Sequence, residues 1–512
     1  MRFLTYFLLP LLVSAAEGTR PNIVLIYADD IGWGDLGCYG AKVIPTPHAD
    51  RLAAEGTRYV SGYCTSATCT PSRYGMLTGE YPWRRKGTGI LPGDAALIIP
   101  RSRPTVATAL KDAGYTTGVI GKWHLGLGEL EVDWNRPIKP SPREVGFDYS
   151  FIMAATGDRV PCVFVENGSV VGLDSKDPIE VSYKRPFPGD PDLKSGEVRA
   201  ALAMDWSLGH NMALINKVGR IGWMRGGASA IWDDTTMGDT FATKACEFIA
   251  RNKSKPFFLY YASHENHVPR IIHPRFVGKT PLGPRGDAVV SFDDQVGRIL
   301  AELERQGLTG NTLVILTSDN GHVLDDGYKD RAVELNRAAG HTPAGPFRGG
   351  KYSVYQGGTR VPFLVRWPGH VPAGKVSEAL VSQVDFAASF TRIGGGDSAP
   401  FVALDSIDVS AALLGSEKST REYVISQGIG LAFSIREGDW SLVPGHGRKS
   451  AKARNEAEGG DSEILAGDQL YNLAKDPGQK TNVIAANPAI AARLKDRLEA
   501  TKAKGIEQPL PR

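Results

Sequence analysis

Oxygen-bearing side chains that could bind a metal ion occur in two short stretches of the sequence. Asp29 and Asp30 are adjacent and follow one apolar run, and Asp319 and Asn320 follow another. Adjacent carboxylates repel each other and are tolerated where a cation lies between them. Carboxylate and amide oxygens are the ligands that hard divalent ions such as Ca²⁺ or Mg²⁺ prefer. The acidic pair alone is equally consistent with a solvated loop.

Cationic and imidazole side chains follow two further apolar runs. Lys122 and His124 come directly after residues 116–120, and His264 follows residues 256–261. Taken singly, each is more simply explained as a helix cap or a turn residue. His264 and His267 also form an HxxH pair that could bind zinc, although an isolated pair is a weak indication.

The elements that carry these residues alternate along the chain. Apolar runs rich in β-branched and aromatic residues predict strands, and amphipathic stretches between them predict helices. The predicted strands are 23–27, 116–120, 256–261 and 312–317, and the predicted helices are 47–55, 105–113, 237–251 and 288–306. This alternation predicts an α/β fold with a large, mostly parallel sheet flanked by helices. In such sheets ligands bind beyond the carboxyl ends of the strands, where the polar residues lie.

The last quarter of the chain differs from the rest. Short strands are predicted at 422–426, 431–443 and 470–473, with a hairpin turn at Glu437-Gly438-Asp439 and a helix at 488–502. We expect a small antiparallel α+β subdomain over residues 401–512, after a catalytic domain over 17–400.

The first residues are typical of a secretory signal peptide. Arg2 is followed by the apolar run 3–13 and by the small residues 14–16. The run is shorter than the roughly 20 residues that a membrane-spanning helix needs. We expect residues 1–16 to be removed and the protein to be exported, to the periplasm or the medium. A membrane anchor is the alternative reading.

The net charge of the chain bears on its possible partners, and its cysteine content bears on possible metal and redox motifs. The 512 residues carry 59 Lys and Arg against 56 Asp and Glu, a net charge of +3, which argues against nucleic acid as the main partner. The five cysteines leave at least one thiol unpaired, and no CxxC spacing indicates a zinc or redox motif. They are Cys38, Cys64, Cys69, Cys162 and Cys246.

One segment is specific enough to indicate a family. Cys69-Thr70-Pro71-Ser72-Arg73, followed by Leu77-Thr78-Gly79, resembles the signature of the type I sulfatases, which belong to the alkaline-phosphatase-like superfamily. The resemblance extends over most of the chain and is nearest to arylsulfatases and N-acetylgalactosamine-6-sulfatases. Its other motifs are 29–35, 46–53, 121–126, 317–321, 348–362 and 468–483.

The resemblance implies a cofactor set and a role for each site residue. Cys69 would be oxidised to formylglycine by a formylglycine-generating enzyme, which would leave four thiols for two possible disulfides. One Ca²⁺ would be bound by Asp29, Asp30, Asp319, Asn320 and the modified Cys69. Arg73 would hold the modified residue, Lys122 would flank it and His124 would act as a base toward one hydroxyl. His264 and Lys351 would grip the sulfate and the leaving oxygen, one of them as the acid.

The implied chemistry is consistent with these residue types. The hydrate of an aldehyde carries two hydroxyls, so that one can attack sulfur and the other can then expel sulfate. A dication with Lys122, Arg73 and Lys351 would stabilise charge on the transferring group. We expect hydrolysis of sulfate esters of a glycan, by preference 6-O-sulfated galactose or N-acetylgalactosamine, or of an aryl sulfate. The alternatives are a phosphomonoester or phosphonate hydrolase, and a non-catalytic protein that binds sulfated glycans.

Overall fold

The computed structural model describes residues 20–402, 404–445 and 467–504. The predicted signal peptide, residues 1–16, lies outside this part of the chain. Within the described residues, no helix has the length and apolar character needed to cross a membrane.

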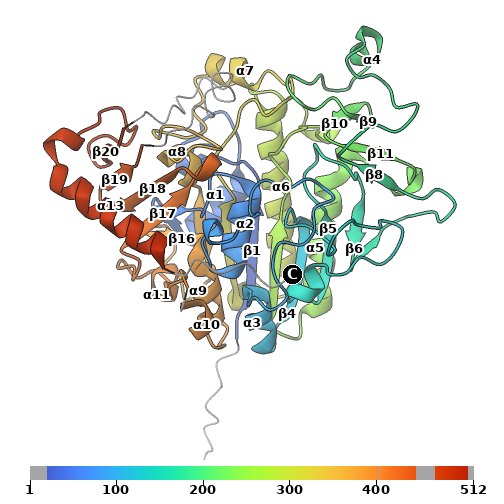
Figure 1. Cartoon of the computed structure of the whole chain (residues 1–512). Helices are drawn as coiled ribbons and strands as arrows, with labels where there is room; N and C mark the ends of the chain where they lie inside the picture. The colour runs from blue at the N-terminus through green and yellow to red at the C-terminus, as the bar shows by residue number, and fades with distance from the viewer. Residues whose placement is uncertain (1–19, 403, 446–466, 505–512) are drawn as a thin grey trace, which may run out of the picture.

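A ten-stranded mixed sheet forms the centre of the molecule (Figure 1). β1 (Asn22–Ala28) is fully buried and pairs in parallel with β12 (Phe257–Ala262) and β13 (Thr312–Ser318). β4 (Thr116–Lys122) pairs in parallel with β12 and with β5 (Tyr149–Met153). The four strands predicted from apolar runs are therefore confirmed, and they are neighbours in the sheet.

Shorter strands at both edges make the sheet mixed. β14 (Phe363–Arg366) runs antiparallel to β13 and to β2 (Thr57–Tyr59). β15 (Lys375–Ser377) extends that edge in parallel, and β6 (Phe164–Glu166) and β7 (Ser169–Val170) extend the other edge antiparallel.

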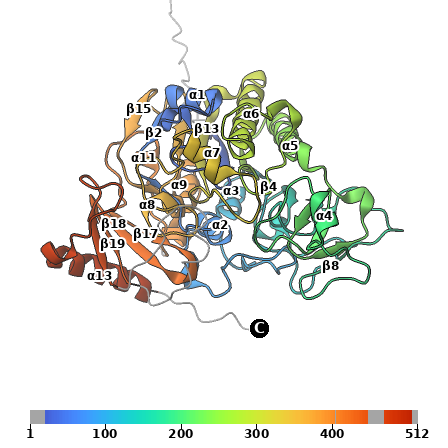
Figure 2. The ribbon, with the colours of Figure 1, turned by 90° about the horizontal axis from the view of Figure 1, so that it is seen from above.

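Helices cover both faces of the sheet (Figure 2). One layer holds α1 (Pro47–Glu55), α5 (Met237–Asn252) and α6 (Pro284–Arg305), which pack on one another. The other layer holds α2 (Cys69–Thr78), α3 (Val106–Asp112) and α9 (Phe386–Ile393). α6 begins four residues earlier than predicted, because Pro284 occupies its first turn, where a missing N–H costs nothing.

An insertion between β7 and α5 forms a separate set of small elements beside the sheet. β8 pairs antiparallel with β11, and β9 pairs antiparallel with β10. The bounds are β8 (Glu180–Ser182), α4 (Gly196–Ala200), β9 (Ala213–Ile215), β10 (Val218–Arg220) and β11 (Trp223–Arg225).

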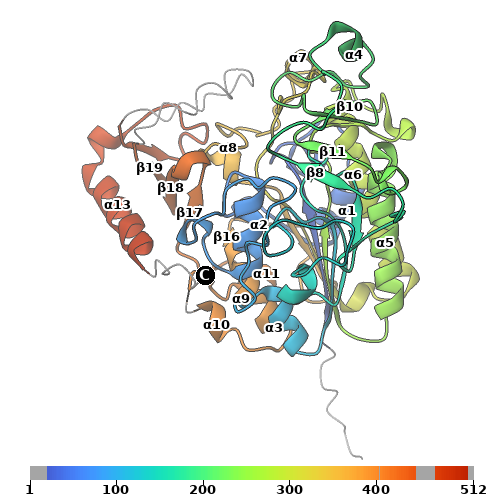
Figure 3. The same ribbon diagram turned by 45° about the vertical axis from the view of Figure 1, so that its right-hand side comes forward.

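The C-terminal part forms the predicted antiparallel sheet (Figure 3). Its strands are β17 (Tyr423–Gln427), β18 (Phe433–Glu437), β19 (Trp440–Val443) and β20 (Gln469–Asn472), and α13 (Pro488–Ala503) packs against β18 and β19. Gly438 makes the predicted turn with a positive φ of 55°. Tyr81 and Val384 of the larger part belong to the same apolar cluster as Leu442 and Leu494. The boundary at residue 400 stays a prediction.

A buried ion pair fixes the loop that follows β1. Arg285 donates to both carboxylate oxygens of Asp35 at 2.9 and 2.7 Å, and both side chains are fully buried. His341 Nε2 lies 2.9 Å from Asp35 Oδ1. Burial would raise the pKa of Asp35, but Arg285 and His341 outweigh it and hold that pKa below its usual range.

Arg285→Met is expected to lower the free energy of unfolding by about 3–5 kcal/mol, because it leaves the Asp35 charge buried without its main partner. The matched control is Arg101→Met, whose pair with Glu129 is exposed on both sides and is expected to contribute about 1 kcal/mol or less. Denaturant midpoints measure both effects. Equal midpoints for the two variants would contradict this assignment.

Candidate active site

The carboxylates and the cysteine singled out in the sequence meet at one place in the structure. Asp29 and Asp30 follow β1, Asp319 follows β13, and Cys69 is the first residue of α2. One ligand atom from each of these four buried residues lies within 4.8 Å of the others. The parallel register of β1 and β13, which pairs Ala28 with Ser318, sets Asp29 beside Asp319.

The residues present fit a hard divalent cation. Asn320 Nδ2 donates to Asp30 Oδ1 at 2.6 Å and to the Gly321 carbonyl at 2.9 Å. Asn320 Oδ1 is buried and has no hydrogen-bond partner, which is uncommon for a buried oxygen and is explained if it is a ligand. Three carboxylates and this amide form an oxygen-rich set of the kind that binds Ca²⁺ or Mg²⁺.

Two buried lysines lie against the acidic pair. Lys122 Nζ is 2.6 Å from Asp29 Oδ2, and Lys351 Nζ is 2.8 Å from Asp30 Oδ2. Both ammonium groups have a raised pKa, because the nearby carboxylates outweigh the burial that would lower it. Each lysine is therefore charged at neutral pH and adjacent to the cysteine.

Arg73 joins the helix that carries Cys69 to the carboxylates. Its Nε and Nη2 donate to Asp319 Oδ2 at 3.1 and 2.8 Å. Its Nη1 donates to the Lys122 carbonyl and to the Tyr260 hydroxyl, both at 3.1 Å. With Lys122 and Lys351, Arg73 supplies three positive charges beside three carboxylates.

Burial acts to raise the pKa of all three carboxyl groups, and the neighbouring charges decide the net shift of each. It raises the pKa of Asp29 to about 8, even though Lys122 opposes the shift, and it raises the pKa of Asp30. The pKa of Asp319 is lowered, because Arg73 and the two lysines outweigh the effect of burial. A bound dication would favour the charged form of all three groups.

His124 lies next to the amino end of α2, where Thr70 Oγ1 donates to its backbone carbonyl at 3.0 Å. Its Nε2 is 2.9 Å from the Leu91 carbonyl, so the proton of the neutral ring lies on that nitrogen. Its Nδ1 is buried without a hydrogen-bond partner. Burial also holds the pKa of His124 well below its usual range. The ring is neutral at pH 7 and offers Nδ1 as a proton acceptor.

His264, predicted to grip the sulfate, lies outside the cluster around Cys69. It belongs to no group of three or more candidate metal ligands among the described residues. Its ring packs edge-on against Phe241 with the centroids 5.7 Å apart, and burial lowers its pKa to about 4. In the described part of the chain, His264 and His267 therefore do not form a zinc site together.

His267 is the imidazole that the structure brings to Cys69. One of its ring nitrogens, Cys69 Sγ and an Asp29 oxygen lie within 4.8 Å of one another. Its Nε2 is 3.9 Å from Asp30 Oδ2, and its Nδ1 is 2.7 Å from the Val268 carbonyl. In the sequence, His267 stands out only as the second half of the HxxH pair, and the spacing alone could not rank it above His264.

We expect His267→Ala to lower kcat by about 10²–10⁴-fold, the range for loss of a proton-transferring group. His264→Ala is expected to cost less, because that ring packs against Phe241 outside the cluster. Steady-state kinetics on one sulfate ester compares the two variants. A larger loss for His264→Ala would reverse the assignment.

Asp326 is a second residue that the sequence analysis missed. Its Oδ2 accepts from Lys351 Nζ at 2.8 Å, and its Oδ1 accepts from the Tyr352 hydroxyl at 2.7 Å. Lys351 is thus held between Asp30 and Asp326, which orients its ammonium group.

A polar wall adjoins these residues and is formed by the loop between β5 and β6 together with His210 of the insertion. Asp158 Oδ2 accepts from His210 Nε2 at 2.9 Å, and Arg159 Nη1 lies 2.8 and 2.9 Å from the two Asp158 oxygens. The hydroxyl of Thr156 also bonds to Asp158. Arg159 is close enough to His124 to help lower its pKa, although burial is the main cause. We call Asp158, Arg159 and His210 the polar wall.

No disulfide forms between the remaining cysteines. All five thiols are unpaired in the structure, and each lies within the described residues. The two possible disulfides considered from the sequence are therefore not formed. Cys64 and Cys162 are buried, where a thiol packs like a small apolar side chain.

Comparison with known proteins identifies the family. The family model described as Sulfatase matches residues 21–395. The chain belongs to the sulfatase family. This sulfatase is 47% identical over 493 residues to an N-acetylgalactosamine-6-O-sulfatase of Bacteroides thetaiotaomicron, with 96% of this chain and 95% of the relative covered. It is 32% identical over 520 residues to arylsulfatase A of Homo sapiens, with 97% and 90% covered.

A solved structure supports the same conclusion. The sulfatase superposes with a TM-score of 0.89 and 46% identity on a protein from a study of glycosaminoglycan metabolism by Bacteroides thetaiotaomicron. The superposition covers 95% of this chain and 100% of that one. The alkaline-phosphatase-like α/β fold predicted from the sequence is confirmed. The sulfatase is an enzyme that hydrolyses sulfate esters, as expected, rather than the phosphate hydrolase or binding protein considered as alternatives.

Proposed function

We propose that this sulfatase removes the 6-O-sulfate from galactose or N-acetylgalactosamine units of glycans. The main support for the substrate is the near full-length similarity to a relative named as an N-acetylgalactosamine-6-O-sulfatase. The main support for the mechanism is the position of Cys69 among three carboxylates and Asn320.

Two groups would complete the site. One Ca²⁺, held by Asp29, Asp30, Asp319, Asn320 and the modified Cys69, would supply positive charge to the transferring sulfate. Cys69 oxidised to formylglycine would supply a hydrate whose first hydroxyl attacks sulfur and whose second allows sulfate to be expelled.

The chain's own cations would bind and orient the sulfate. Lys122 and Lys351 are charged, buried and next to Cys69, so each can donate to a sulfate oxygen. Arg73 would keep Asp319 and the amino end of α2 in a fixed relation, since it bonds to both Asp319 and the Lys122 carbonyl.

Two neutral imidazoles would move the protons. His124 Nδ1, buried and unpartnered, can accept the proton of the second hydroxyl. His267 Nδ1 donates to the Val268 carbonyl, which leaves the lone pair of Nε2 toward Asp30. That nitrogen can accept the proton of the attacking hydroxyl and then donate it to the leaving sugar oxygen. His264 would support this region from outside the cluster.

The polar wall would contact the sugar. Asp158 and Arg159 form a buried ion pair, and Nε and Nη2 of Arg159 bond to no described residue. Sugar hydroxyls are both donors and acceptors, so a buried carboxylate, imidazole and guanidinium can distinguish their positions.

Burial of Cys69 also bears on its maturation. Its side chain is only 2% exposed, so a formylglycine-generating enzyme would have to act before the fold closes. This order agrees with modification during export, after which residues 1–16 would be removed.

The test is desulfation of galactose and N-acetylgalactosamine carrying sulfate at position 2, 3, 4 or 6. We expect kcat/KM for the 6-sulfates to exceed that for the other isomers by about 10²-fold or more, as for a site that bonds to specific hydroxyls. Turnover of an aryl sulfate is compared with turnover of an aryl phosphate that has the same leaving group. This comparison shows which of the two esters the enzyme hydrolyses. Preference for another sulfate position would overturn the proposed substrate.

A further inference from the structure

A basic cavity lies between the catalytic part and the C-terminal sheet. Its volume is about 610 Å³, within the range of small-molecule sites. None of the described residues that line it is acidic. The lining residues that matter here are His322, Asn336, Arg337, Phe347, Arg348 and Lys480. We call this space the basic cavity.

The basic cavity shares its walls with the loops that carry the site. The Lys351 amide donates to the carbonyl of His322, a lining residue, at 2.7 Å. The Gly34 amide, four residues after Asp30, donates to the carbonyl of Pro343, another lining residue, at 2.6 Å. α7 (Ala332–Ala338), which supplies Asn336 and Arg337, lies at the end of the sheet opposite α3 (Figure 1).

The side chains of this cavity are suited to an anion. Arg337 and Lys480 are exposed and form no ion pair with any described residue. Arg348 lies 4.0 Å above the Tyr355 ring and donates to the Gln479 carbonyl at 3.1 Å, which fixes the rim. Asn336 Oδ1 and His322 Nδ1 are buried without hydrogen-bond partners. Such atoms can be satisfied by the hydroxyls of a bound sugar.

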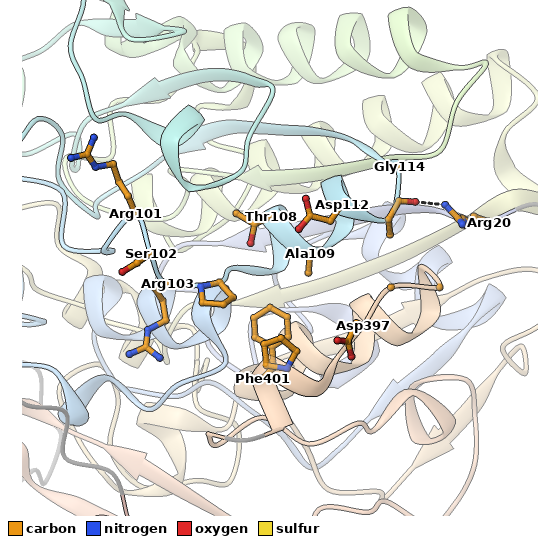
Figure 4. Close-up of a pocket in the computed structure, with 15 residues that line it drawn as sticks. Arg20, Arg101, Ser102, Arg103, Thr108, Ala109, Asp112, Gly114, Asp397 and Phe401 are labelled. Carbon is orange, nitrogen blue, oxygen red and sulfur yellow. Dashed lines mark hydrogen bonds between the residues drawn. The ribbon is translucent and has the colours of Figure 1, made fainter. Parts of the chain in front are cut away.

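A second, larger cavity differs in both position and charge. It measures about 830 Å³ and is lined by residues of α3 and α10 (Ala399–Val402) (Figure 4). α3 leads into β4, so this cavity lies at the end of the sheet opposite the candidate ligands. Its cationic groups are engaged: Arg101 pairs with Glu129, and Arg20 donates to the Ala113 carbonyl. Asp112 and Asp397 add negative charge. It therefore offers no comparable anion site.

We propose that the basic cavity binds an anionic group, a carboxylate or a sulfate ester, on the sugar next to the one being desulfated. This inference rests on the proposed function and adds a second subsite to it. Arg337 and Lys480 would attract the anion, and Phe347 and the two unpartnered polar atoms would contact the sugar ring. The enzyme would then prefer acidic glycan chains to neutral ones.

Three disaccharides test the proposal at low ionic strength. Each carries the same 6-sulfated N-acetylgalactosamine, linked to a hexuronate, to the carboxyl-reduced neutral sugar, or to a sulfated neutral sugar. We expect at least one anionic disaccharide to have a KM about tenfold below that of the neutral one, as two partly exposed ion pairs can provide. Comparison of the hexuronate disaccharide with the sulfated disaccharide shows whether the basic cavity binds a carboxylate or a sulfate ester.

Charge-neutral variants assign the preference to the cavity. Arg337→Gln/Lys480→Gln is expected to abolish the tenfold preference and to leave kcat on the 6-sulfated monosaccharide unchanged. The control, Lys253→Gln/Lys255→Gln, removes two exposed charges before β12, at the opposite end of the sheet, and should keep the preference.

The outcomes separate the two proposals. If the 6-sulfated monosaccharide is not hydrolysed, the proposed function fails. If it is hydrolysed but no anionic disaccharide is preferred, or the preference survives in Arg337→Gln/Lys480→Gln, the basic cavity is not a subsite.

Discussion

Cys69→Ala is expected to lower kcat on any sulfate ester by roughly 10⁶-fold, as removal of a catalytic nucleophile does elsewhere. Cys69 Sγ lies within 4.8 Å of one oxygen from each of Asp29, Asp30 and Asp319. Lys122 and Lys351 would still bind the sulfate, so KM should change far less than kcat. Turnover of a chromogenic sulfate ester by the purified variant measures the effect.

Cys69→Ser separates the nucleophile from its oxidised form. A serine has one hydroxyl, so it can attack sulfur but has no second hydroxyl to expel sulfate. We expect at most one product molecule per enzyme, and a serine-sulfate that mass spectrometry of the peptide detects. The same analysis of the wild type should give a Cys69 peptide lighter by a sulfur and two hydrogens, less an oxygen. Full activity with an unmodified thiol would refute the mechanism.

Removal of the divalent cation is the second large effect that we expect. Chelation should abolish turnover, since the ion would stabilise charge on the transferring group. Ca²⁺ added at 100 times its Kd should restore activity and stabilise the fold by about 2.7 kcal/mol. Thermal unfolding with and without Ca²⁺ measures this stabilisation independently of activity.

A matched pair of variants assigns the ion to the carboxylate cluster. Asp30→Asn removes one charged ligand, so it should weaken both the activity and the Ca²⁺-dependent stabilisation. Asp325→Asn alters a neighbouring carboxylate that bonds to Ser207 and to the Gly327 amide, outside the cluster. Asp325→Asn should retain both the activity and the Ca²⁺-dependent stabilisation. A Ca²⁺-dependent shift that survives in Asp30→Asn would place the ion elsewhere.

The central strands could be predicted and the edge strands could not. β1, β4, β12 and β13 are buried on both faces, so each appears in the sequence as a continuous apolar run. Edge strands such as β7 and β15 have only two or three residues and no such run. Their pairing depends on neighbours far away in the chain, which a local pattern does not record.

The same distinction applies to the site. Asp29, Asp30, Lys122, His124 and Asp319 directly follow or end parallel strands, and such residues converge wherever the strands become neighbours. His264 and His267 also follow a strand, but their spacing could not decide which ring turns toward Cys69. The packing of the backbone after β12 turns the His267 ring, and not the His264 ring, toward Cys69.

The sequence by itself determined the family and named the candidate nucleophile and ligands, because these residues lie in short motifs whose spacing reflects strand ends. Only the tertiary structure decided that His267 reaches Cys69 and that Asp326 holds Lys351. It also joined Asp158 to His210, 52 residues apart, and built the basic cavity from α7 and the loop before α13. Contacts between such distant segments depend on how the elements pack, and no local pattern in the chain specifies that packing.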